Sequence, residues 1–196
     1  MADSDYDLFL KNLSKHISLD EKDIEIFTSA FKLKKVKKSE FLLQTGDVCR
    51  YEYFVNKGCL RTYTIDPNGF EHILMFSVED WWAGDMYSFL TQTPALFNID
   101  ALEESEVFQI DYPSIELLYK KVPKFERYFR IIIQNSFITQ QRRIIQNISS
   151  SAEDRFLQFK NKYPDLIERI PQKHIAAYLG ITPEFFSVLR KKLEKK

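Results

Sequence analysis

The pattern of hydrophobic and polar residues changes period along the chain, from helical to β and back to helical. Tyr6, Phe9 and Leu13 recur at helical spacing, which predicts a helix over residues 4–17. Ser18 and Glu21 have the spacing of a capping box, so we expect a second helix to open there. The lysine-rich residues 32–38 follow, and we interpret them as a solvated edge strand rather than a nucleic-acid patch, because lysine protects strand edges.

From Glu40 to Asp111 the pattern is one of short hydrophobic runs separated by turn residues. The runs cover residues 41–43, 51–55, 59–65, 70–76, 97–102 and 107–110. We find no helix-length run inside this block. Strands of this length at near-regular spacing predict an antiparallel barrel or sandwich.

A short helix over Pro113–Lys121 is followed by a long helix over residues 124–149 that contains neither glycine nor proline. Its hydrophobic residues lie on more than one stripe, so the helix needs more than one partner. We expect the β block to be one partner and a second copy of the chain to be the other, packed as a parallel helix pair. A long helix buried within one monomer is the alternative. The polar residues 149–154 predict a hinge.

The last stretch predicts two short helices with a tight turn between them. The first runs from Gln172 to Leu179, and Gly180 allows the left-handed turn. Thr182 can cap a second helix that begins with Pro183. This arrangement is typical of a helix-turn-helix, whose second helix enters the DNA major groove. The candidate DNA-binding residues are Lys173, His174, Thr182, Glu184, Ser187, Val188, Arg190, Lys191 and Lys192.

Composition and charge fit this interpretation. The 196 residues carry no net charge, but residues 150–196 hold 10 of the 28 basic and only 6 of the 28 acidic side chains. A basic end on an acidic body suits a local polyanion site. We find no signal peptide and no membrane-length hydrophobic run, and we expect a cytoplasmic protein with two reduced cysteines. We see no catalytic constellation and no metal-ligand spacing among the histidines, so we expect neither an enzyme nor a cofactor.

The order of elements, together with L-L-Q-T-G-D (42–47), F-V-N-K-G-C-L-R (54–61) and W-A-G-D (82–85), resembles the cyclic-AMP receptor protein (Crp/Fnr) family of bacterial transcription regulators. The resemblance implies an α+β fold: an antiparallel β-roll of the cyclic-nucleotide-binding type, a double-stranded β-helix, with flanking helices. It implies a sensor domain over residues 1–122, a dimerisation helix over 123–149 and a helix-turn-helix domain over 150–196. Double-stranded DNA and a second copy of the chain are the implied partners. RNA polymerase and an unknown small-molecule effector are further candidates, and no membrane is involved.

Departures from the family pattern bear on ligand and operator. The family's Gly-Glu matches Gly84-Asp85, but the Arg-Ser pair that holds the cyclic phosphate falls on Ala95-Leu96. Because a buried phosphate would lack a charge-assisted donor there, we expect no tight binding of cyclic AMP. The pocket either takes a less anionic ligand or is filled by its own side chains. The residues assigned to it are Trp81, Trp82, Gly84, Asp85, Phe89, Ala95, Leu96 and Phe97.

The recognition helix also differs from the family pattern. Of the family's R-E-x-x-x-R only Glu184 is matched, because Pro183 and Val188 replace both arginines, so the operator should differ. Two cysteines, both after residue 40, do not fit the four-cysteine pattern of the oxygen-sensing branch.

The sequence ends where many members carry a β-hairpin wing. We expect four lysines to take over the wing's phosphate contacts: Lys191, Lys192, Lys195 and Lys196. Two other interpretations remain. One is a small-molecule-binding β-roll protein whose C-terminal helices form a partner or dimer module. The other is a cupin-type β-barrel enzyme, which the absence of histidine pairs disfavours.

Overall fold

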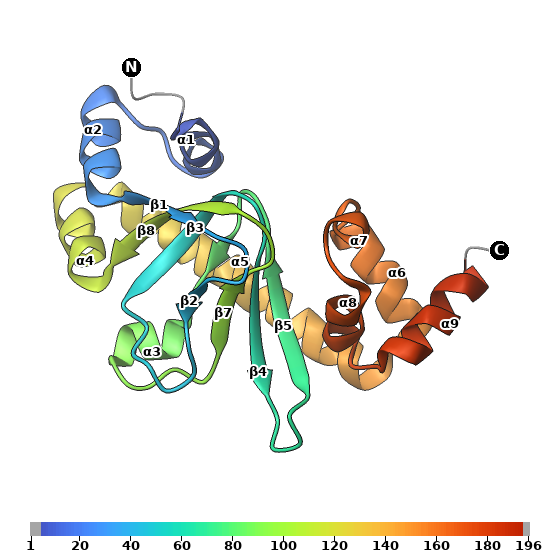
Figure 1. The fold of residues 1–196 in the computed structure, drawn as a ribbon. Helices are drawn as coiled ribbons and strands as arrows, with labels where there is room; N and C mark the ends of the chain where they lie inside the picture. The colour runs from blue at the N-terminus through green and yellow to red at the C-terminus, as the bar shows by residue number, and fades with distance from the viewer. Residues whose placement is uncertain (1–4, 194–196) are drawn as a thin grey trace. The chain divides into compact units, whose positions relative to one another are not determined.

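A computed structural model describes residues 5–193, which fall into two compact units. Unit 1 comprises residues 5–64 and Met75–Gln134, and unit 2 comprises Ile65–Leu74 and residues 135–193. Unit 1 therefore holds most of the β structure, and unit 2 holds the C-terminal helices with the tip of one β-hairpin. Figure 1 shows the elements in chain order.

The strands form two four-stranded sheets, in the orders β1-β8-β3-β6 and β2-β7-β4-β5. Their bounds are β1 Lys32–Val36, β2 Phe41–Leu43, β3 Tyr51–Lys57, β4 Leu60–Ile65, β5 Glu71–Ser77, β6 Trp82–Ala83, β7 Asn98–Ala101 and β8 Ser105–Asp111. The ladders are antiparallel; for example, Lys32 pairs with Gln109. The predicted antiparallel β block is confirmed, and the lysine-rich β1 lies at a sheet edge as expected.

Helices pack against the first of these sheets through aromatic side chains. The helices of unit 1 are α1 Asp7–Ser14, α2 Glu21–Ala30, α3 Met86–Thr91 and α4 Tyr112–Lys121. Phe9 of α1 stacks on Phe54 of β3 with ring centroids 3.9 Å apart, and both rings are fully buried. Phe27 of α2 meets Phe9 edge to face at 4.7 Å. Each of these rings contributes about 1.5–3 kcal/mol through burial.

Two local predictions in unit 1 were wrong. The capping box of α2 is formed by Asp20 and Asp23, which exchange side-chain-to-backbone hydrogen bonds, and not by Ser18 and Glu21. An aspartate directly before the helix caps it better than a serine two positions earlier. The block between Glu40 and Asp111 also contains the six-residue helix α3, capped by Asp85.

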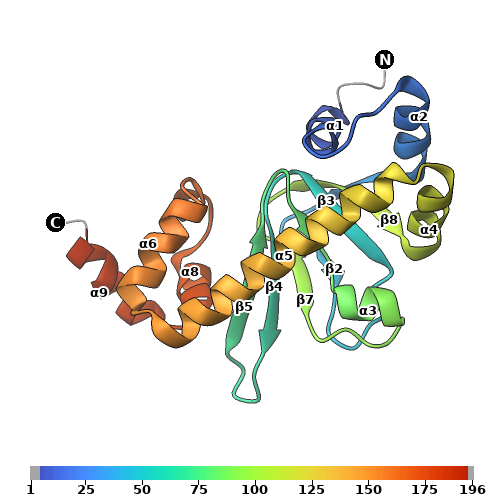
Figure 2. The same ribbon diagram turned by 180° about the vertical axis from the view of Figure 1, so that it is seen from behind.

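The long helix α5 runs over Lys124–Ser149, as predicted, and Figure 2 shows it as one uninterrupted helix. Within unit 1, Phe125, Tyr128 and Phe129 of α5 are buried. Further along, large hydrophobic side chains are exposed on α5: Ile133, Phe137, Ile138, Ile144, Ile145 and Ile148. This half of the helix carries an apolar surface that its own chain does not cover.

Unit 2 continues with four more helices. They are α6 Ala152–Lys162, α7 Leu166–Arg169, α8 Gln172–Leu179 and α9 Pro183–Leu193. Ser151 and Asp154 form the capping box that opens α6, so this helix begins inside the stretch 149–154 that was predicted as a hinge. The short helix α7 has no counterpart in the sequence-based prediction.

Candidate nucleic-acid interface and sensor pocket

The turn between α8 and α9 has the backbone that the sequence predicts. Gly180 lies in the left-handed region with φ +67°, and its N–H donates to the carbonyl of Ala176. The Thr182 hydroxyl accepts the backbone N–H of Phe185 at 3.2 Å, which caps the first turn of α9. The left-handed Gly180 ends α8 and the Thr182 cap starts α9, so the turn between the two helices takes only three residues.

A small hydrophobic core holds the two helices at a close approach. Ala176 and Ile175 of α8 are fully buried, as is Phe186 of α9. Phe186 meets Phe156 of α6 edge to face with ring centroids 5.2 Å apart. A small residue at 176 lets the helices cross closely, so α9 is presented on a packed support.

The surface of α9 is formed by both charged and apolar side chains. Glu184, Val188 and Lys191 are exposed, and Ser187 and Arg190 are half-buried. A carboxylate, hydroxyl and guanidinium on one helix can contact base edges and phosphates. The predicted residues of α9 therefore lie on a surface that a groove could meet.

The choice between two adjacent phenylalanines was left open by the sequence. Phe186 fills the core, whereas the Phe185 ring is 50% exposed beside Glu184. Phe185 was not among the predicted DNA-binding residues. An exposed aromatic ring at the start of a recognition helix can make apolar contact with a thymine methyl group, so Phe185 joins the candidate set.

Other predicted DNA-binding residues differ in their surroundings. Lys173 and Thr182 are exposed, but the Thr182 hydroxyl is already used in the cap. His174 is buried, and its Nδ1 lies 3.7 Å from Glu71 Oε2, so the expected phosphate contact of this imidazole does not fit its position. Lys192 donates to Glu153 Oε2 at 3.0 Å; an exposed pair like this contributes about 0–1 kcal/mol and can be exchanged for a phosphate. Lys195 and Lys196 lie outside the described residues.

In the sensor region, Asp85 directs both carboxylate oxygens inward. Oδ1 accepts the N–H of Ser88 at 3.1 Å, and Oδ2 accepts the N–H of Leu96 at 3.0 Å. The side chain is 1% exposed. Asp85, which matches the glutamate of the family's Gly-Glu, therefore holds its own loop in place.

A second carboxyl group lies beside this loop. Glu52 on β3 is buried, and a Cβ placed on Gly84 would lie 2.2 Å from Glu52 Oε1. Burial, and then the nearby charge of Asp85, raises the pKa of Glu52 to about 8. The buried carboxyl groups of Glu52 and Asp85 therefore lie near each other beside Gly84.

The aromatic residues assigned to the pocket mostly serve the core. Trp82 packs edge to face on Phe54 and Phe129, and its Nε1–H donates to the Tyr128 hydroxyl at 3.1 Å. Phe89 is 2% exposed and meets Tyr112 edge to face. Of the expected lining, Trp82 and Phe89 are thus engaged with other side chains, and Trp81 and Phe97 are half-buried.

The two positions that replace the family's phosphate-binding pair offer no charge. Ala95 is 2% exposed and Leu96 is 60% exposed. An anion held against alanine and leucine, with Glu52 and Asp85 close by, would lose hydration without gaining an ionic partner. The geometry agrees with the expectation that cyclic AMP does not bind tightly.

Cysteine and metal chemistry add little to the site. Cys49 and Cys59 are buried and are not joined in a disulfide, and burial raises the pKa of Cys49 to about 11. Among residues 5–193, no group of three histidine, cysteine or acidic side chains is placed to hold a metal ion. Within the same residues, no helix is long and apolar enough to cross a membrane.

Comparison with known proteins gives consistent relatives. Residues 33–121 match the model of the cyclic nucleotide-binding domain. The chain is 26% identical to the anaerobic regulatory protein of Pasteurella multocida, over 96% of this chain and 73% of that protein. It is 28% identical to the regulatory protein HlyX of Actinobacillus pleuropneumoniae, over 83% of this chain and 71% of that protein.

Solved structures with the same fold have lower sequence identity. FixK2 of Bradyrhizobium japonicum has a TM-score of 0.74 at 16% identity, covering 84% of this chain and 85% of that one. The global regulator CLP of Xanthomonas campestris, described as responsive to c-di-GMP, has a TM-score of 0.70 at 18% identity, covering 90% of this chain and 92% of that one.

Proposed function

We propose that this chain, which belongs to the Crp/Fnr family of bacterial transcription regulators, reads a two-fold symmetric DNA operator as a homodimer in the cytoplasm. The observation that carries the proposal is the turn between α8 and α9. Gly180 and Thr182 end and restart the helix so that Glu184, Val188 and Lys191 stand exposed on a packed three-helix support. The relatives are named as regulators rather than enzymes.

The dimer in this proposal is built on α5. Exposed hydrophobic side chains on its second half, Phe137, Ile144 and Ile148 among them, recur at helical spacing. A second copy packed along this stripe would bury them and would present two recognition helices. The proposal assigns residues 1–122 to a sensor domain, residues 123–149 to the dimerisation helix and residues 150–196 to the DNA-binding domain.

The signal to which the sensor responds is not cyclic AMP in this proposal. The apolar side chains of Ala95 and Leu96, together with the buried carboxyl group of Asp85, disfavour an anionic ligand at the loop that starts with Gly84. A neutral or cationic effector, or a loop that is filled by its own side chains, fits these residues better.

Selection of genomic fragments by the full-length protein tests the proposal. We expect the recovered fragments to share two inverted half-sites about 10 base pairs apart, centre to centre. Binding to random DNA should follow a straight line of log affinity against log salt concentration. If no sequence is enriched and the affinity for DNA does not change with salt concentration, the proposal of sequence-specific DNA binding is wrong. Recovered fragments that share a single half-site without a two-fold pattern would support DNA binding by α9 but would contradict the symmetric dimer.

A further inference from the structure

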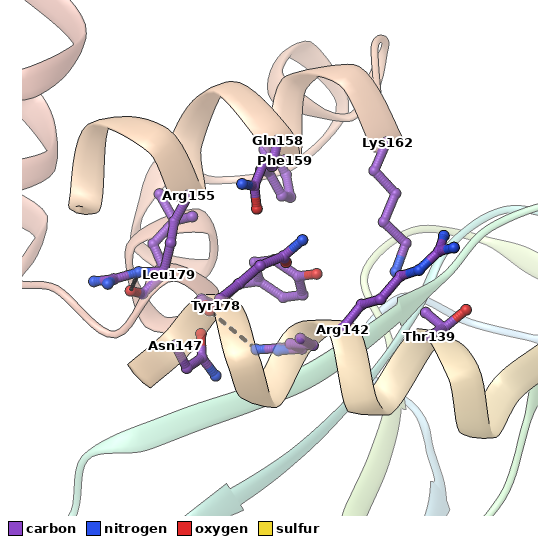
Figure 3. A pocket seen from close by; sticks show the side chains of 11 residues that line it. Thr139, Arg142, Asn147, Arg155, Gln158, Phe159, Lys162, Tyr178 and Leu179 are labelled. Atoms are coloured by element: carbon purple, nitrogen blue, oxygen red, sulfur yellow. Dashed lines mark hydrogen bonds between the residues drawn. The ribbon is translucent and has the colours of Figure 1, made fainter. Parts of the chain in front are cut away.

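A basic pocket in unit 2 lies between the second half of α5, the helix α6 and the end of α8. Its volume is about 310 Å³. The lining residues are Thr139, Arg142, Arg143, Gln146, Asn147, Arg155, Gln158, Phe159, Lys162, Tyr178 and Leu179. Figure 3 shows Lys162 reaching from α6 toward Arg142 on α5, with Gln158 also projecting from α6. The recognition helix α9 does not contribute to the described lining of this pocket.

The charge of this basic pocket is one-sided. Four cationic side chains line it, and none of the described lining residues is acidic. Arg155 is already engaged, because it donates to the carbonyls of Ser150 at 2.7 Å and Leu179 at 3.1 Å. The other three cations are Arg142 and Arg143 on α5 and Lys162 on α6, so positive charge enters the basic pocket from two helices. Like charges held together are costly unless an anion joins them.

Two buried polar atoms in the basic pocket have no hydrogen-bond partner. Arg143 uses Nη2 to donate to the carbonyls of Ile73 at 2.6 Å and Tyr178 at 3.0 Å, but its Nη1 is buried and unsatisfied. Gln158 Oε1 is buried and unsatisfied as well. Leaving such groups unpaired destabilises the folded protein, and more so for a charged group, so their presence requires an explanation. A bound polar ligand would supply one.

The surroundings of Lys162 disfavour the charged form of its ammonium group. Burial, and then the nearby charge of Arg143, lowers its pKa to about 8. An anion placed between these cations would raise this pKa again, because a nearby negative charge favours the charged form of the ammonium.

The basic pocket opens on a different side of α5 from the apolar stripe. Thr139, Arg143 and Gln146 are spaced three or four residues apart and share one face of the helix. Phe137, Ile144 and Ile148, spaced seven and four residues apart, occupy another face. A partner packed along the stripe would therefore leave the basic pocket uncovered.

We propose that the basic pocket is a binding site for a small anion that carries a phosphate group, held by Arg142, Arg143 and Lys162. Planar guanidinium groups bind phosphate oxygens through paired charge-assisted hydrogen bonds, and Lys162 adds a compact positive charge. The volume lies at the lower end of the range for small-molecule sites, about 300–1,000 Å³. This site is separate from the loop at Gly84, and the proposal does not require that the protein read DNA.

Titration calorimetry with inorganic pyrophosphate tests the site on the full-length protein, at constant ionic strength set with chloride. We expect saturable binding of one pyrophosphate per chain. Arg142→Gln and Lys162→Gln should each weaken it by about tenfold to a hundredfold. Arg130→Gln removes the same charge from an exposed position of α5 outside the lining and should leave the affinity unchanged. Melting curves of each variant establish that it is folded.

Two results would overturn the proposal: no saturable binding to the wild-type protein, or a loss with Arg130→Gln as large as that with Arg142→Gln. A second titration in the presence of saturating duplex DNA identifies the source of the phosphate. Unchanged pyrophosphate affinity means that a free small molecule fills the site. If saturating DNA abolishes pyrophosphate binding, while Arg142→Gln and Lys162→Gln still weaken that binding when no DNA is present, a phosphate of the DNA backbone fills the site.

Discussion

The carboxyl group of Glu52 lies so close to Gly84 that any side chain at position 84 would overlap it, with a Cβ only 2.2 Å from Glu52 Oε1. Glycine is therefore required here for close approach and not for its backbone angle. Glu52 is buried, and this burial, followed by the nearby charge of Asp85, raises the pKa of its carboxyl group to about 8.

Replacing Glu52 with glutamine should change how stability depends on pH. The folded protein keeps the Glu52 proton up to about pH 8, whereas the unfolded chain releases it near the ordinary value of 4.5. The free energy of unfolding should then fall as pH rises from about 4.5 to about 8. Glu52→Gln should remove this slope and stabilise the protein at pH 8 by on the order of a few kcal/mol. Urea unfolding across this pH range measures both effects.

A matched variant, Glu126→Gln, removes the same charge from an exposed position and should keep the wild-type slope. If the curves of Glu52→Gln and the wild type run parallel, Glu52 is ionised in the folded protein and the account of the sensor loop is wrong.

Substitutions of Gly180 should show whether backbone strain or side-chain packing limits which residue the turn between α8 and α9 accepts. Its φ is +67°, and a Cβ there would meet nothing within 4 Å, so only the conformation opposes a side chain. Gly180→Val should lower the free energy of unfolding of the C-terminal helices by about 1–2 kcal/mol, whereas Gly180→Asn should lower it much less. Denaturant unfolding followed by circular dichroism compares the two. Equal losses for both would mean that the left-handed turn is not what position 180 supplies.

Residues on the surface of α9 should separate sequence reading from phosphate contact. Glu184→Ala should relax the preference for one base pair while leaving affinity for random DNA nearly unchanged. Lys191→Gln should weaken binding to all sequences alike and reduce the salt slope by about 1. Fluorescence anisotropy with operator and random duplexes at several salt concentrations measures both. Identical effects of the two variants on all DNA would show that α9 does not discriminate bases.

A charge on the exposed stripe of α5 should break the dimer. Ile145 is 62% exposed in the single chain, and Ile145→Glu would place a carboxylate in the proposed helix pair. We expect sedimentation to shift from dimer to monomer, and DNA affinity to fall with it. Ser136→Glu, on another exposed part of the same helix, should remain dimeric. A monomeric wild-type protein would refute the pairing.

Hydrophobic spacing was enough to predict the elements that have a strong period of their own. The 26 residues of α5 and the turn at Gly180 follow from spacing, from the lack of helix breakers and from cap chemistry. Spacing could not choose between Phe185 and Phe186, because they lie four and three residues before Leu189 and either position can share its helix face. The helix α3 was missed because its six residues show no period, although Asp85 as a cap was a usable signal.

Features built from distant segments were beyond the sequence. His174 is buried because it faces Glu71 from the tip of the β4–β5 hairpin, about a hundred residues earlier in the chain. The basic pocket combines three helices whose arginines and lysine look like ordinary solvated charges when the chain is read in order. Tertiary packing, and not local propensity, decides which of these charges are buried.

The only two tryptophans of the sequence are neighbours, at positions 81 and 82. The hydrogen bond from the Trp82 indole to Tyr128 fixes one of these chromophores in the sensor core, and none lies in α6, α8 or α9. The tryptophan fluorescence of the unlabelled protein therefore comes from unit 1 alone. A shift in its emission maximum upon addition of a metabolite offers a direct optical screen for the natural signal.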